Sequence, residues 1–265
     1  MTKRAQFRTL PVFGADERSV SEVVRGIMDG KTNNTGEITL ATGNATTTTL
    51  FDGRIGKESL LFFTPVTDAA EADAAPYGAF QDTTDQTAAN TTTAYPITLN
   101  TTDYSNGVYV SNSSRINVRN YGIYNIQFSI QLKNTTNDGQ DIDIWFRKNG
   151  TNVAASNSRF HINARKSSGD PSHLIASLNF FLELNANDYV EIMWRTTNVG
   201  VSLEHFDADT SPTRPSVPSV IVTVSYVAPA ATSNVYVSAQ QQGQATVSHW
   251  ANSTASKTYG YIVVG

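Results

Sequence analysis

Four histidines are the side chains of this 265-residue sequence best suited to acid–base or metal chemistry: His161, His173, His205 and His249. None has HExxH or short i, i+2 spacing, and no cysteine is present to assist as a metal ligand. The pairs Ser172-His173 and Ser248-His249 place a hydroxyl beside an imidazole, but adjacency in sequence does not create the geometry of a catalytic triad. We therefore predict that the protein is not an enzyme and has no catalytic residue, no metal site and no bound cofactor.

The acidic side chains also argue against an enzyme. The densest polar cluster is EHFDAD at 204–209. It could form a loop that binds calcium or a surface ligand, but it lacks EF-hand spacing. A solvated turn explains it better. Glycoside cleavage needs two carboxyl groups held in a cleft. Asp143, Glu183 and Glu191 fall at positions that should face solvent, which disfavours a capsule depolymerase.

Composition excludes several partners. The formal net charge of −4 and the isoelectric point of about 5.5 provide no basic field for a phosphate backbone, so we expect no nucleic-acid partner. No stretch approaches the roughly 20 apolar residues of a membrane span, and the first 20 residues lack a signal-peptide core, so we expect synthesis in a cytoplasm without membrane insertion. A Thr/Asn/Ser-rich, cysteine-free chain of this kind is typical of virion proteins.

One helix is expected near the start of the chain. Ser19 and Glu22 have capping-box spacing, and Gly30 supplies a stop, which predicts a helix over about 16–29 after an extended arm at 1–15. The helix has an apolar stripe with i, i+3, i+4 spacing, made by Val20, Val23, Val24, Ile27 and Met28. This stripe needs a partner surface, either the adjacent β module or a neighbouring subunit, and it is our candidate for attachment to a larger particle.

The rest of the chain is predicted to be all-β. Strands are expected within 35–67, followed by a linker at 73–94. Regular alternation then marks strands at 121–132, 141–148, 176–184, 189–196 and 219–227, with a type I′ turn at Asn149-Gly150. Short antiparallel strands of this kind favour a jelly-roll sandwich. Trp145, Phe181, Tyr189 and Met193 alternate away from its core stripe, and they either fill a second layer or form a subunit interface.

Residues 95–228 resemble the jelly roll shared by tumour necrosis factor and the globular head of the first complement component, in the version found in tailed-phage structural proteins. The resemblance is carried by the aromatic-Gly-x-Tyr entry at Tyr121–Tyr124, the Asn149-Gly150 hairpin and the Leu-x-x-x-Asp-Tyr-Val pattern that ends at Val190. It implies the fold and, because related jelly rolls trimerise about a threefold axis, a homotrimer. The animal function is not implied.

The flanking segments resemble a small module of tail-fibre and other phage virion proteins. Thr64-Pro65 and Ala69-Ala70 match one half of its pattern; Tyr236–Ala239, Gly243, Thr246 and His249 match the other. The resemblance implies a discontinuous small β module, 16–72 with 231–265, into which the jelly roll at 95–228 is inserted.

These resemblances imply a structural virion component of a tailed phage. A tail-associated fibre or fibre-anchoring protein is the first expectation, and a capsid-surface decoration protein or head fibre is the second. Its expected partners are further copies of itself and other virion proteins of the tail or capsid. A third possibility, from another class, is an adhesin module that binds a host-surface glycan through Trp194 or Trp250.

Overall fold

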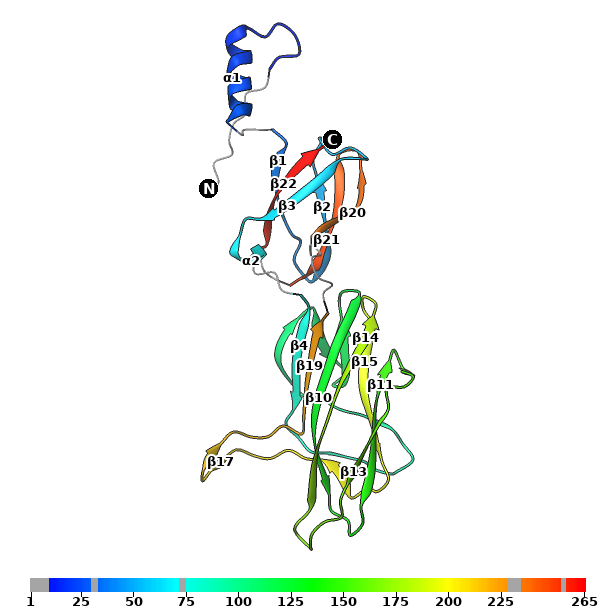
Figure 1. Cartoon of the computed structure of the whole chain (residues 1–265). Coiled ribbons are helices and arrows are strands. Elements are labelled where there is room, and N and C mark those ends of the chain that lie inside the picture. Colours follow the sequence, from blue (N-terminus) through cyan, green and yellow to red (C-terminus); the bar gives the residue numbers. More distant parts are fainter. Residues whose placement is uncertain (1–9, 30–32, 72–74, 228–234, 254–255) are drawn as a thin grey trace.

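The computed structural model describes residues 10–29, 33–71, 75–227, 235–253 and 256–265. The molecule is elongated, with helix α1 at one end, a small β module in the middle and a larger β sandwich at the other end (Figure 1). The fold is mostly β and antiparallel, which confirms the predicted class. Residues 1–9 of the predicted arm and the helix stop predicted at Gly30 lie outside the described residues.

Helix α1 spans Glu17–Met28, which confirms the predicted helix. The backbone N–H of Ser19 donates a hydrogen bond of 2.6 Å to Oδ1 of Asp16, so the N-cap is Asp16 and the cap predicted at Ser19 is wrong. Asp caps a helix as well as Ser does, and the acidic Glu17 in the first turn also suits the positive end of the helix dipole. The helix therefore begins directly after Asp16, and Ser19 lies within its first turn.

The small β module consists of two three-stranded antiparallel sheets, β1–β22–β3 and β2–β21–β20. In each sheet the central strand comes from the C-terminal end of the chain and at least one neighbour comes from the N-terminal part. The elements of the module are β1 (Thr35–Thr39), β2 (Ala45–Phe51), β3 (Leu60–Pro65), α2 (Asp68–Glu71), β20 (Tyr236–Gln241), β21 (Gln244–Asn252) and β22 (Thr258–Val264). Its core is separate from that of the sandwich and includes Ile38, Leu50, Ile55, Val247, Tyr259 and Val263.

The sandwich is built from the strands between the two halves of the small module. They are β4 (Tyr77–Asp82), β5 (Gln86–Thr87), β6 (Tyr95–Pro96), β7 (Thr101–Asn106), β8 (Val108–Ser111), β9 (Arg115–Val118), β10 (Gly122–Asn134), β11 (Gln140–Lys148), β12 (Thr151–Asn152), β13 (Ser158–Ile162), β14 (Ser172–Leu184), β15 (Tyr189–Thr196), β16 (Val201–Leu203), β17 (Asp209–Thr210), β18 (Thr213–Arg214) and β19 (Val220–Tyr226). Strands β17 and β18 form a hairpin that projects sideways from the sandwich (Figure 1).

Two sheets enclose the sandwich core. The first contains β14, β10, β19, β4 and β7 in that spatial order, and the second contains β8, β9, β15 and β11, with β13 and β12 beyond β11. Alternate residues point inward, as the sequence predicts: Phe128 from β10, Phe146 from β11 and Trp194 from β15 are all buried. The turn predicted at Asn149-Gly150 is also confirmed, since both residues have the positive φ of a type I′ turn, 47° and 81°.

The linker predicted at 73–94 is wrong for most of its length, because β4 and β5 lie within it and the sandwich begins at Tyr77. Glycine and alanine give the segment that forms β4 the composition of a linker. Gly78 is buried, and a Cβ at this position would lie 2.6 Å from the ring of Phe80, so only glycine leaves room for that ring. Strand β4 pairs with β19 on one side and with β7 on the other, inside the first sheet.

The chain enters and leaves the sandwich at the same end, where Tyr77 is in register with Ser225. Side chains also join the sandwich to the small module. The amide of Asn120 donates to the backbone oxygen of His249 (3.4 Å) and accepts from the backbone N–H of Ala251 (3.2 Å). The ring of Trp250 lies edge-on to that of Tyr226, with the centroids 4.7 Å apart. We interpret residues 75–227 as a domain inserted into the flanking module.

Candidate functional site

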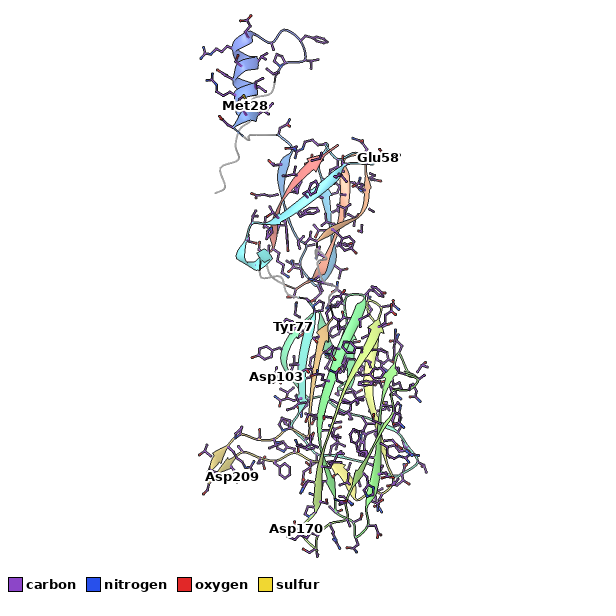
Figure 2. The ribbon with its side chains drawn as sticks, in the orientation of Figure 1. Met28, Glu58, Tyr77, Asp103, Asp170 and Asp209 are labelled. Atoms are coloured by element: carbon purple, nitrogen blue, oxygen red, sulfur yellow. The ribbon has the colours of Figure 1, made fainter. Side chains whose placement is uncertain are left out.

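The apolar stripe of α1 lies open to solvent. Val20, Val24, Ile27 and Met28 are 39%, 49%, 57% and 82% exposed, and Val23 is half-buried. The adjacent β module, one of the two partners expected for this stripe, therefore does not cover it in this structure. Met28 lies at the end of the helix nearer the module, and the helix stands apart from the sheets (Figure 2).

The four predicted interface residues do not form one surface. Phe181 lies on the outer face of β14 in the first sheet and is 58% exposed. Trp145, Tyr189 and Met193 lie on the outer face of the second sheet, where Trp145 and Met193 are register partners. Met193 is only 1% exposed and Trp145 and Tyr189 are half-buried, so the expectation that these four residues share one exposed interface surface is wrong.

The outer face of the first sheet is the more apolar of the two. Ile123, Ile175 and Ile221 are exposed there, on the same side as Phe181, and they come from β10, β14 and β19. These residues were not predicted. The signal for Ile221 was nonetheless present, because it stands between Val220 and Val222, where a strand with one solvated face would carry a polar residue.

Glu183 is exposed as expected, but Asp143 and Glu191 are not. The latter two point away from the core, yet they are 5% and 4% exposed because arginine side chains cover them. Arg159 and Arg195 both bind the carboxylate of Asp143, and the hydrogen bond from Arg159 is the main reason that the pKa of this carboxyl is lowered.

Glu191 has an equivalent environment. Its Oε2 accepts hydrogen bonds of 3.0 and 2.8 Å from Nε and Nη2 of Arg147, and its Oε1 accepts one of 2.9 Å from the hydroxyl of Ser114. Nε of Arg115 lies 3.8 Å from the same Oε1, and the guanidinium of Arg115 lies over the ring of Tyr189. On the outer face of the second sheet, two carboxylates are therefore each held between two arginines.

The EHFDAD cluster is divided in the structure. Glu204 is buried and binds His173, with Nε2 of His173 2.7 Å from Oε2 of Glu204, and it also forms an ion pair with Lys133. Asp207 and Asp209 lie instead on or next to the projecting hairpin, where Asp209 is labelled in Figure 2. Within the described part of the chain, no three acidic or histidine side chains are grouped so that they could hold a metal ion.

The two tryptophans considered for glycan binding lie in different environments. Trp194 is 1% exposed, inside the sandwich, with its ring centroid 5.8 Å from that of Tyr95, so its predicted binding role is wrong. Trp250 is half-buried against Tyr226 at the junction. Position 194 follows the inward alternation of Val190 and Ile192, which is the signal that places it in the core.

The small module has a hollow of about 750 Å³ beside β1, β3 and β22, lined in part by the exposed side chains of Phe51 and Phe62. Next to it, the hydroxyl of Tyr261 donates a 2.7 Å hydrogen bond to Asp52, which also binds Arg54. The guanidinium of Arg54 holds the pKa of Asp52 well below its usual range, and burial raises the pKa of Tyr261 to about 12. This network joins the two halves of the module.

No family model and no curated protein sequence matches the chain. Among the helices of the described residues, none is long and apolar enough to cross a membrane.

Proposed function

We propose that this chain is a structural component of a tailed-phage virion, a tail-associated fibre or fibre-anchoring protein. It attaches through α1 and the small module and displays the sandwich. The observation that carries the proposal is the exposed apolar stripe of α1, which lies at the opposite end of the molecule from the sandwich (Figure 1). A capsid-surface decoration protein or head fibre would use the same layout, and the symmetry of its position in the particle distinguishes the two.

The attachment step follows from the energetics of α1. Isolated helices shorter than about 12–15 residues are marginal in water. Helix α1 has 12 residues and all but one of the five side chains of its apolar stripe remain exposed, so a partner surface is needed to stabilise it. Burying an exposed Val or Ile side chain contributes roughly 1.5–3 kcal/mol. Other virion proteins are the proposed partners.

The test is the composition of purified particles. If the proposal is right, quantitative mass spectrometry will find the chain in particles in a fixed ratio to the capsid protein. The double variant Val24→Asp/Ile27→Asp should reduce its incorporation at least tenfold, because charges cannot be buried in an apolar contact. The matched control, Arg18→Asp/Arg25→Asp on the polar side of α1, should be incorporated normally. A chain that is never particle-associated would overturn the proposal.

Self-association, as a homotrimer, is proposed through the outer face of the first sheet, because exposed apolar patches of this kind mark interaction surfaces. The double variant Ile123→Asp/Phe181→Asp should reduce the molar mass measured by light scattering to that of one chain. Tyr189→Asp changes the opposite sheet and should leave the wild-type mass unchanged. If the wild-type protein is itself monomeric at high concentration, this part of the proposal fails.

A further inference from the structure

The outer face of the second sheet carries two parallel rows of charged side chains, which we call the four-arginine face: Arg115, Arg147, Arg159 and Arg195, with Asp143 and Glu191. In one row Asp143 lies in register between Arg159 and Arg195. In the other, Glu191 lies between Arg147 and Arg115. Each row has two guanidinium groups and one carboxylate.

The charges that reach solvent on this face are mainly positive. Four guanidinium groups face two carboxylates, and the carboxylate side chains are only 7% and 5% exposed, whereas those of the arginines are 29–59% exposed. The next row outward pairs Asp141 with His161 instead. This face therefore differs in sign from the chain as a whole, whose formal net charge is −4.

The guanidinium groups keep hydrogen-bonding capacity for a ligand. Each has five N–H donors in a planar fork suited to carboxylate, sulfate or phosphate groups. Asp143 takes two of these donors from Arg159 and one from Arg195. The same carboxylates fix the positions of the arginines, so less conformational entropy is lost when a ligand binds.

The spacing suits an extended chain. The two arginines of one row are separated by two strand spacings, about 10 Å, and the rows are four residues apart along the strands, about 13 Å. Between the rows lie Trp145 and its register partner Met193. Nε1 of Trp145 donates to Asn152 over 2.9 Å, which holds the indole in place. An aromatic face is electron-rich and suits the C–H side of a sugar ring.

We propose that the four-arginine face binds an acidic polysaccharide, whose carboxylate, sulfate or phosphate groups contact the two arginine rows while a sugar ring packs on Trp145. A nucleic acid fits less well, because the net negative charge of the protein opposes it and a single aromatic offers little stacking. This inference does not rest on the proposed function, since binding is measured on the isolated protein.

The test is calorimetric titration of the full chain with polygalacturonate, dextran sulfate, neutral dextran and poly-L-glutamate. We expect one or both acidic polysaccharides to bind, neutral dextran not to bind, and added salt to weaken the binding. Polygalacturonate and dextran sulfate distinguish a carboxylate from a sulfate ligand.

The main variant is Arg115→Gln/Arg195→Gln, which leaves Glu191 with Arg147 and Asp143 with Arg159, so both buried carboxylates keep a partner. It should weaken binding at least tenfold. Trp145→Ala, which alters no ion pair, should weaken polysaccharide binding several-fold without affecting any binding of poly-L-glutamate. Arg214→Gln, on the projecting hairpin, is the matched control and should bind like wild type.

Three results would overturn the inference. The first is that neither acidic polysaccharide binds at millimolar sugar concentration. The second is that poly-L-glutamate binds as tightly and with the same sensitivity to Trp145→Ala, which would indicate a surface for acidic protein segments. The third is that the arginine variant changes the molar mass of the protein, which would indicate an interface between copies.

Discussion

Removal of residues 256–265 should abolish the folded small module and leave the sandwich folded. These residues include β22, the central strand of one of the two sheets, which pairs with both β1 and β3. Without β22, neither neighbour has a partner in that sheet, and the core loses Tyr259, Tyr261 and Val263. The expected loss is the whole free energy of unfolding of the module, about 5 kcal/mol or more for a small domain.

Differential scanning calorimetry measures this loss as the disappearance of one of two unfolding transitions. The control is a chain that lacks residues 1–28, which removes α1 and should keep both transitions. If the C-terminal truncation instead abolishes both transitions, the sandwich does not fold independently, and the interpretation of residues 75–227 as an inserted domain is wrong.

Trp194→Ala should destabilise the sandwich by about 3–5 kcal/mol, the usual cost of truncating a large aromatic side chain in a core. Trp194 is among the largest fully buried side chains, and its removal leaves a cavity beside Tyr95. The midpoint of urea unfolding should fall for the sandwich transition, while that of the small module should not change.

Trp145→Ala is the matched control, because Trp145 is the register neighbour of Met193 on the outer side of the same sheet. It loses one hydrogen bond to Asn152 and the buried part of a half-exposed indole, so it should destabilise the sandwich by clearly less than Trp194→Ala. Equal destabilisation by the two substitutions would contradict the assignment of Trp194 to the core.

Local periodicity predicted five strands of the sandwich, β10, β11, β14, β15 and β19, because burial on one face imposes alternation directly on neighbouring residues. Strands β7, β8, β9 and β13 were not predicted. Ile126, Phe128 and Ile130 follow this rule throughout β10. It failed at β4, where Gly78 faces inward and adds no apolar side chain to the pattern. The N-cap was also misplaced, since Asp16 and Ser19 are both suitable capping residues and only the backbone geometry distinguishes them.

The four-arginine face could not be predicted from one strand at a time. Alternation indicates that Asp143 and Glu191 point away from the core, but their burial depends on which side chains lie across from them. The antiparallel register places Arg195 opposite Asp143 and Arg147 opposite Glu191. The small module required pairing between segments that lie far apart in the sequence, and only its resemblance to a known module suggested that pairing.

The order of strands in the β1–β22–β3 sheet has a consequence for how the protein resists tension. The chain from α1 enters at Thr35, in register with Ile262 near the C-terminal end of β22, while the chain to the sandwich leaves at Pro65, in register with Tyr259 at the other end. A pull between α1 and the sandwich therefore acts along the strands and loads their hydrogen bonds in shear, all together. An unzipping pull would break them one at a time, so this sheet is arranged to carry load.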